Sequence, residues 1–159
     1  MHPAMTRLAP LLLTLLAFAV ASCGGDDAPT REEFAKSANE ICRETEQALE
    51  NVGQDAESPQ DVADAVDRVI EESRSAVDQL ADLERPEGDA GDSAETFVNA
   101  TRTEIEDKGI PALEDLRDAL ADGDQQAAQE AAQQLQAIDS EASNKAAKEL
   151  GANECAEEE

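Results

Sequence analysis

Large apolar residues are scarce in this chain, and their spacing decides what it can fold into. After residue 22, only 21 of 137 residues are Leu, Ile, Val or Phe, which is about 15%. So small a share, together with a net charge of −26, is typical of a disordered protein. The apolar residues nevertheless recur at steps of three and four between clear stop signals, which indicates amphipathic helices. We therefore predict an all-α fold, with disorder as the alternative that the composition leaves open.

Two segments in the first half show the helical pattern most clearly. The first opens with Thr30-Arg31-Glu32-Glu33, a capping box in which the two outer side chains satisfy free backbone N–H groups, and it should end at Gly53. The second opens at Ser58-Pro59, with serine as the N-cap and proline at the first helical position, and it should end at Pro86-Glu87-Gly88. The predicted buried stripes are Phe34, Ala38, Ile41, Cys42, Thr45, Ala48, Leu49 and Val52 in the first segment, and Val62, Val66, Val69, Ile70, Val77, Leu80 and Leu83 in the second.

The second half carries two further segments. A third segment runs from about Asp92 to Leu120, and Gly109-Ile110-Pro111 interrupts it without changing the phase of its stripe, which predicts one kinked helix. The turn Asp122-Gly123-Asp124 precedes a fourth, alanine-rich segment, whose predicted cap is the second of these aspartates and whose predicted end is Gly151. The stripes are Phe97, Thr101, Ile105, Leu113, Leu116 and Leu120 in the third segment, and Ala128, Ala131, Leu135, Ile138, Ala142, Ala146 and Leu150 in the fourth.

Four amphipathic helices with short connections bury their stripes most simply against one another. The predicted fold is therefore a four-helix antiparallel bundle with a kinked third helix. Helices one and four are then neighbours, and Cys42 and Cys155 lie near the same end of the bundle. In an oxidising compartment a disulfide is the expected state of this pair, and closing a loop of 113 residues would stabilise the fold by about 4 to 5 kcal/mol. Two separate thiols are the alternative.

The N-terminal region has the parts of an export signal. His2 and Arg7 precede an apolar run, residues 8–21, that is too short to span a bilayer with its flanks. The run ends in Val20-Ala21-Ser22-Cys23, which resembles the lipobox of bacterial lipoproteins, and the resemblance implies that Cys23 is diacylated and becomes the first residue of the mature protein. An ordinary secretory cut, releasing a protein that begins at Ser22, is the alternative. That cut would leave three cysteines, and hence an odd thiol, in an exported protein.

These signals divide the chain into four predicted parts. They are a lipoprotein signal peptide, residues 1–22, a lipidated flexible tether, 23–29, an acidic helical bundle, 30–155, and an acidic tail, 156–159. Two acyl chains hold a protein on a membrane where one chain is marginal. The tether reaches at most about 20 Å from the lipid surface, at about 3.5 Å per residue. The expected location is the extracytoplasmic face of the cell membrane.

Removing residues 1–22 restricts the chemistry of the remainder. No His, Trp or Tyr remains, and Phe34 and Phe97 are the remaining aromatic residues. Eleven basic residues face 38 acidic ones, so the net charge becomes −27 and nucleic acid is not an expected partner. The carboxylates fall mainly on polar helix faces, without the desolvated pocket that acid catalysis needs, and no Gly-x-Ser-x-Gly elbow occurs. We therefore expect no enzyme, no catalytic residue and no cofactor.

Two groups of carboxylates suggest a metal site as a competing reading. Glu87, Asp89, Asp92 and Glu95 surround glycines between helices two and three, and Asp118, Asp122 and Asp124 surround Gly123. Oxygen ligands of this kind suit Ca²⁺ or Mg²⁺, but neither group has the spacing of an EF-hand loop. Asp and Gly are also ordinary turn and cap residues. We favour turn chemistry and predict no metal ligand.

Three short stretches are similar to those of a known set of proteins. They are Cys23-Gly24-Gly25-Asp26, Phe34-Ala35-Lys36-Ser37-Ala38-Asn39-Glu40-Ile41-Cys42 and Glu149-Leu150-Gly151-Ala152-Asn153-Glu154-Cys155. The chain resembles, in these stretches, small helical-bundle lipoproteins of high-GC Gram-positive bacteria. The resemblance implies location and architecture, with one cysteine in helix one and another just after the last helix. It supplies no substrate and no catalytic residue.

The sequence therefore favours a non-enzymatic lipoprotein that acts as a helical binding or structural module of the cell envelope. Its expected contacts are the membrane, through the lipid anchor, and an envelope protein. The alternative is a ligand- or divalent-cation-binding lipoprotein accessory to transport. A cavity with converging polar groups between the helices would favour the alternative, whereas a solid core with an exposed apolar stripe would favour the module.

Overall fold

The computed structural model describes residues 28–156, and every regular element in this range is a helix. The elements are α1 (Arg31–Leu49), α2 (Pro59–Asp82), α3 (Asp89–Glu104), the π-helix η1 (Ile105–Gly109), α4 (Ile110–Asp122), α5 (Gln125–Gln136), α6 (Glu141–Leu150) and the 3₁₀-helix η2 (Asn153–Cys155). The predicted all-α class is confirmed. The predicted signal peptide, the lipidation site Cys23 and residues 157–159 of the tail lie outside the described residues.

Helices α1 and α2 begin where the capping signals place them. In α1 the Glu33 amide donates to Thr30 Oγ1 at 3.2 Å, and the Thr30 amide donates to Glu33 Oε2 at 2.8 Å, which completes the predicted capping box. In α2 the N-cap Ser58 forms the same reciprocal pair with Asp61. The sequence indicated the serine but not its partner, because the usual partner in this motif is Glu or Gln.

The first helix is shorter than predicted. Helix α1 ends at Leu49, and residues 50–55 form turns in which Gly53 adopts a positive φ of 79°. Ala48, predicted to be buried, is exposed, whereas Leu49 and Val52 are half-buried. These turns end the helix before Gly53, so the end predicted from the apolar spacing lies about one turn too late.

The predicted third helix is a continuous helical path made of three pieces. It begins at Asp89, three residues before the predicted start, directly after Gly88 with a φ of 63°. At the predicted interruption, α3 passes through the π-helix η1 into α4, and the Ile110 amide donates to the Ile105 carbonyl in the wider π pattern. Pro111 has no amide hydrogen and crowds the carbonyl four residues earlier in an α-helix, so a locally wider turn accommodates it.

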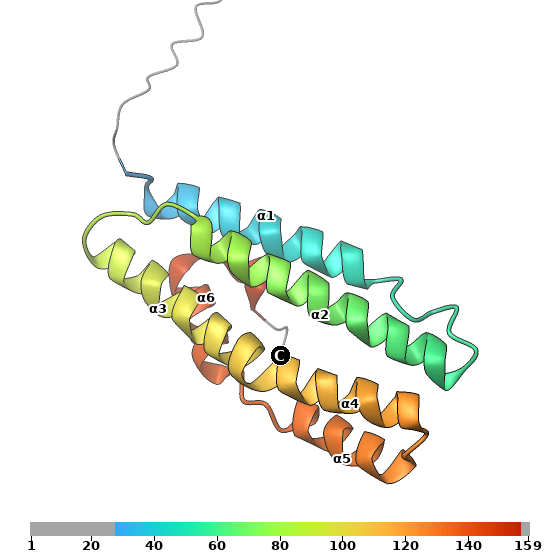
Figure 1. The fold of residues 1–159 in the computed structure, drawn as a ribbon. Helices are drawn as coiled ribbons and strands as arrows, with labels where there is room; N and C mark the ends of the chain where they lie inside the picture. The colour runs from blue at the N-terminus through green and yellow to red at the C-terminus, as the bar shows by residue number, and fades with distance from the viewer. Residues whose placement is uncertain (1–27, 157–159) are drawn as a thin grey trace, which may run out of the picture.

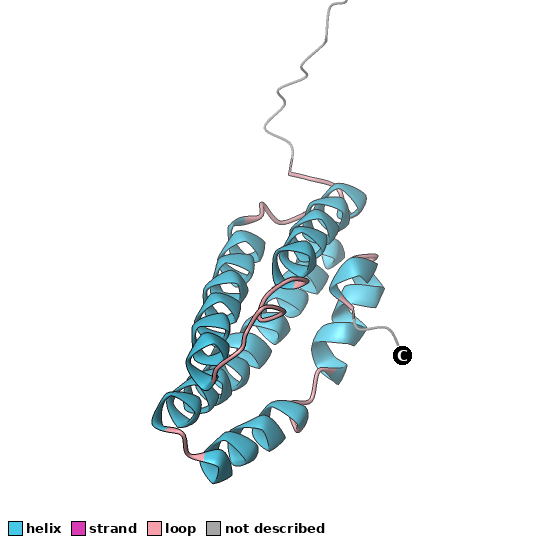
Figure 2. Ribbon diagram, turned by 90° about the vertical axis from the view of Figure 1, so that its right-hand side faces the viewer, coloured by secondary structure: helices cyan, strands magenta, loops and turns pink. Residues whose placement is uncertain are grey.

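The prediction of a single fourth helix is wrong. Residues 137–140 separate α5 from α6, and Figure 2 shows the two as distinct helices joined by a loop. Asp139 Oδ1 accepts from the Glu141 amide at 2.9 Å, which offers the backbone an alternative to the helical hydrogen bond. The break changes the face that α6 buries. Ala142 is exposed against prediction, whereas Ala147, outside the predicted stripe, is fully buried.

The helices pack against one another around two apolar clusters. Helix α2 packs on α1 and α4, α5 packs on α4, α6 packs on α3, and η2 lies against α1 (Figure 1). The larger cluster joins the first half of α1 to the end of α2, the middle of α3 and the end of α6. Its largest members are Phe34, Ile41, Leu80, Phe97, Val98 and Leu150. The smaller cluster occupies the other half and consists of Val66, Ile70 and Ile110, with the half-buried Ile105, Leu113, Leu116 and Leu120 against it. The core is therefore dense at one end and thin at the other.

Candidate functional site

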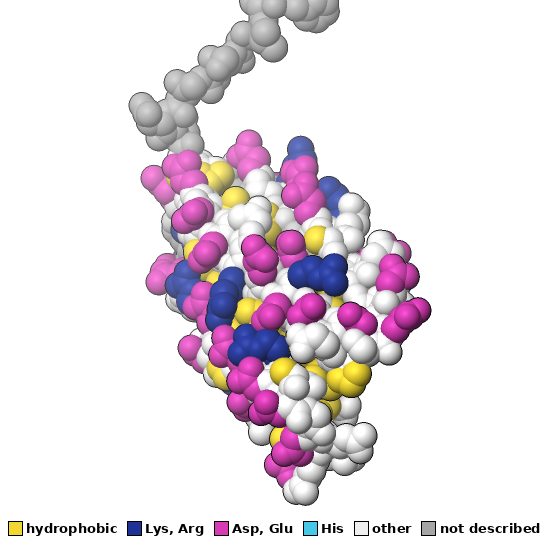
Figure 3. Space-filling view, turned by 45° about the vertical axis from the view of Figure 1, so that its right-hand side comes forward, with side chains coloured by type: hydrophobic (Ala, Val, Ile, Leu, Met, Phe, Trp, Pro, Cys, Tyr) yellow, Lys and Arg dark blue, Asp and Glu magenta, His cyan; other side chains and the backbone are white. Residues whose placement is uncertain are grey.

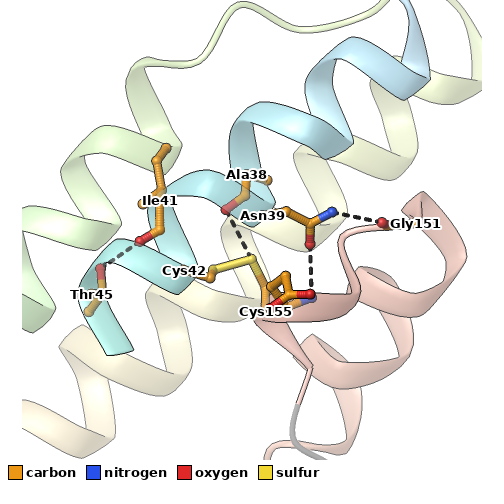
Figure 4. Close-up of a disulfide and its surroundings, with 8 residues drawn as sticks. Ala38, Asn39, Ile41, Cys42, Thr45, Gly151 and Cys155 are labelled. Carbon is orange, nitrogen blue, oxygen red and sulfur yellow. Dashed lines mark hydrogen bonds between the residues drawn. A yellow bond between two sulfur atoms is a disulfide. The ribbon is translucent and has the colours of Figure 1, made fainter. Parts of the chain in front are cut away.

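The two described cysteines meet at the end of the bundle that holds the larger cluster. Cys42, in α1, and Cys155, in η2, form a disulfide with an S–S distance of 2.06 Å and a Cα–Cα distance of 5.2 Å (Figure 4). The predicted pairing is confirmed, and Cys155 reaches α1 on the short helix η2, just beyond the end of α6. The disulfide binds the last described turn of the chain to the first helix.

Asn39 forms a second connection between the same two segments. Its side-chain Nδ2 donates to the Gly151 carbonyl at 3.1 Å, and its Oδ1 accepts from the Glu154 amide at 2.8 Å (Figure 4). Gly151 ends α6 in the left-handed region, with a φ of 88°, which turns the chain back toward α1. Asn39 lies one helical turn before Cys42, and this spacing places both on the same face of α1. The spacing alone did not predict its two hydrogen bonds.

A groove of about 470 Å³ lies beside this double connection. It runs between α1 and the end of α6, and its walls are Glu32, Ala35, Lys36, Asn39, Glu40, Arg43, Leu150, Gly151 and Glu154. Side chains of both charges stand in its walls, so it offers salt-bridge partners to a charged group. Its walls contain no histidine, no free thiol and no serine.

Arg85 closes the end of α2 over the larger cluster. Its guanidinium group donates to the carbonyls of Leu80, at 3.2 Å, Ala81, at 3.1 Å, and Leu83, and it lies 5.5 Å from the centre of the Phe34 ring. Partial burial lowers the pKa of Arg85 from its ordinary value, opposed by the negative charge of Glu95. A cation at a helix C-terminus satisfies free carbonyls and interacts favourably with the helix dipole. Arg85 therefore has a structural role.

Among the carboxylates that suggested a metal site, Asp124 is a helix cap and Asp118 forms an ion pair. Asp124 Oδ1 accepts from the amides of Gln126, at 3.1 Å, and Ala127, at 3.0 Å, and is the N-cap of α5 as predicted. Asp118 pairs with Arg117 at 2.8 Å. Within residues 28–156, no three His, Cys, Asp or Glu side chains converge as a metal site. The four acidic residues around the start of α3 are all exposed.

Comparison of the chain with protein-family models, with curated proteins and with solved structures found no match. Among the helices of residues 28–156, none is both long enough and apolar enough to cross a membrane.

Proposed function

We propose that this chain is a lipoprotein anchored by diacylated Cys23 to the extracytoplasmic face of the cell membrane. Residues 1–22 are its signal peptide, and the acidic bundle is a non-enzymatic binding or structural module of the cell envelope. The proposal also places the protein among the small helical-bundle lipoproteins that its cysteine contexts resemble.

The observation that supports the proposal best is the Cys42–Cys155 disulfide. It pairs two of the three cysteines and leaves Cys23, in the lipobox, as the third. Disulfides persist outside the reducing cytosol. In an exported protein the third cysteine has no partner for a second disulfide within the chain, and the lipobox around Cys23 favours its lipidation.

Two finer features of the fold belong to the proposal. We take the neighbouring helices to run antiparallel, and we take the path from α3 to α4 to bend at η1, because π-helical turns and prolines are common causes of bends. A bundle of such helices is long relative to its tether. The 24 residues of α2 alone span about 36 Å at 1.5 Å per residue. The module would therefore carry a surface well away from the lipid headgroups.

Mass spectrometry of the N-terminal peptide from native membranes tests the anchor. The expected species is a diacylated peptide that begins at Cys23, and an unmodified peptide that begins at Ser22 would refute it. The Cys23→Ala variant should leave the membrane fraction, while Cys155→Ser, which spares the lipobox, should remain there. Site-specific photo-crosslinking in intact cells then tests for an envelope partner.

A further inference from the structure

A small apolar pocket lies at the end of the bundle opposite the point where the chain enters α1. It forms where α2 begins, α4 ends and α5 begins, at the lower right of Figure 1. Its volume is about 360 Å³, and its walls are Pro59, Ala119, Leu120, Gly123, Asp124, Gln125 and Ala128. Five of these seven residues have no polar side-chain atom. The pocket is large enough for one or two aliphatic side chains.

The apolar surface at this end is incompletely covered. Among the described elements, α5 packs extensively against α4 alone. Leu120 and Ala128 are half-buried, and Val62, in the first turn of α2, keeps 37% of its surface exposed. Contiguous exposed apolar surface is typical of interaction sites, whereas a single exposed side chain such as Val62 is ordinary.

Negative charge surrounds the pocket. Between residues 110 and 138 there are six carboxylates and one basic residue, Arg117, which already pairs with Asp67 at 3.0 Å and Asp118 at 2.8 Å. A groove of about 310 Å³ between α4 and α5 adjoins the pocket, and five of the carboxylates line it: Asp115, Asp118, Asp122, Asp124 and Glu130. Figure 3 shows apolar side chains near the lower end of the molecule among Asp and Glu, with the Lys and Arg of that face higher up. We call the pocket and this groove together the distal tip.

The negative charge around the pocket indicates which kind of partner can bind there. A second copy of the chain would bring its own excess of carboxylates, and the acidic tail, residues 156–159, has the same sign. An anionic lipid surface is repelled as well. A cationic segment is attracted instead, and complementary charge also accelerates association. An apolar pocket with an acidic border is therefore matched by a segment that presents one apolar side chain between Lys or Arg residues.

We propose that the distal tip docks a cationic amphipathic segment of another envelope protein. One Leu-sized side chain of the segment fills the pocket between Leu120 and Ala128, and its Lys or Arg residues lie over the carboxylates of α4 and α5. This inference deepens the proposed function, on which it rests, because it names the surface and the partner chemistry of the module.

The test uses a fluorescent amphipathic helical peptide of Leu and Lys as the probe, and a second peptide in which Ser replaces every Leu. Binding to the oxidised full chain carrying Cys23→Ala, which avoids detergent, is measured by fluorescence anisotropy. Ala128→Phe fills the pocket, and Asp115→Asn with Asp122→Asn removes two border charges. Glu44→Gln with Glu46→Gln makes the same charge change on the exposed face of α1 and is the matched control. Circular dichroism verifies that each variant is folded.

The Leu and Lys peptide should bind, and Ala128→Phe should weaken it tenfold or more, about the effect of leaving one aliphatic side chain unburied. The Asp115 and Asp122 pair should weaken it about threefold to tenfold, since an exposed ion pair contributes up to about fivefold. The α1 control pair should weaken it clearly less. No binding, equal binding of the Ser peptide, or equal loss in the control pair would overturn the proposal. A dimer that Ala128→Phe dissociates would overturn it in favour of a second copy.

Photo-crosslinking from intact membranes separates this inference from the proposed function. A crosslinking residue replaces Gln125, at the distal tip, or Glu44, on α1, in the lipidated protein. A crosslink from position 125 to a Lys- or Arg-rich segment supports both proposals, and one to a segment without cations overturns the inference. A crosslink from position 44 alone overturns docking at the distal tip but retains the binding module. A crosslink from neither position counts against both.

Discussion

Loss of the Cys42–Cys155 disulfide should remove much of the stability of this protein. The bond closes a loop of 113 residues, and restricting the unfolded chain over that length is worth about 4 to 5 kcal/mol in the chain-entropy model. The total stability of a domain of this size is about 5 to 15 kcal/mol. The core is also poor in large side chains, because many of its buried residues are alanine. The Cys155→Ser variant should therefore be only marginally folded.

Urea denaturation followed by circular dichroism measures the effect. Domains of this kind unfold with a slope of about 1 to 3 kcal/mol per molar urea, so a loss of about 4 to 5 kcal/mol should lower the midpoint by roughly 1.3 to 5 M. The Cys42→Ser variant and the reduced wild-type protein should show the same shift, since all three lose the same closed loop. Asn39→Ala, with the disulfide intact, removes the two side-chain hydrogen bonds to Gly151 and Glu154 and should cost only about 1 to 3 kcal/mol.

A clearly different result would refute this reasoning. A loss below about 1 kcal/mol on reduction would mean that the unfolded chain is already compact, or that Asn39 and the packing of η2 hold the segment without the bond. A helical signal that is weak even in the oxidised protein would favour the disorder that the composition suggests.

Four further outcomes follow from the structure. Ser58→Ala should cost about 1 kcal/mol in a thermal or urea melt, because it removes the N-cap of α2. Phe97→Ala should cost about 3 to 5 kcal/mol, since the ring is fully buried in the larger cluster, and a cost near zero would contradict that placement. Hydrogen bonds from the backbone and side chain of Thr30 lower the pKa of Glu33 from its ordinary value of 4.5, and those from Ser58 lower the pKa of Asp61 from its ordinary value of 3.8. The two carboxylates therefore stabilise the fold above these ordinary pKa values, and the stabilisation is lost as the pH falls through the lowered pKa values. The melting temperature should hold or rise from pH 7 to about 5, as charge repulsion is relieved, and should fall below about pH 4. Moderate NaCl should stabilise the fold, and CaCl₂ at equal ionic strength should add no saturable shift at micromolar concentration, whereas such a shift would indicate a specific cation site.

The starts of α1, α2 and α5 were predictable from the sequence because each depends on a capping residue and its close neighbours. Thr30 and Ser58 stand directly before periodic segments, and each caps its own helix through neighbours within three residues. The disulfide was predictable for a different reason. The chain has only three cysteines, and in a bundle of helices with short loops Cys42 and Cys155 are expected near the same end.

The break in the fourth segment was not predictable from the apolar spacing. Alanine fits both a buried and an exposed face, so a stripe built from Ala142 and Ala146 carries little information about which side is covered. The buried face of α6 includes Ala147. In the loop before it, the Asp139 side chain accepts from the Glu141 amide and so competes with a helical backbone hydrogen bond. The distal tip escaped prediction as well. It forms where α5, which ends at the break, packs on α4 beside the start of α2.

The disulfide also changes the chain from a line into a ring. Residues 42–155 form a covalently closed circle, and the turns at residues 50–55 and the loop at 137–140 lie within it. A protease that cuts once at either place adds one water molecule and opens the circle but releases no fragment, so the nicked protein keeps all its residues and can retain its packed helices. Two cuts are needed to free a piece, and an electrophoresis gel run without a reducing agent would not separate the two parts of a singly cut molecule.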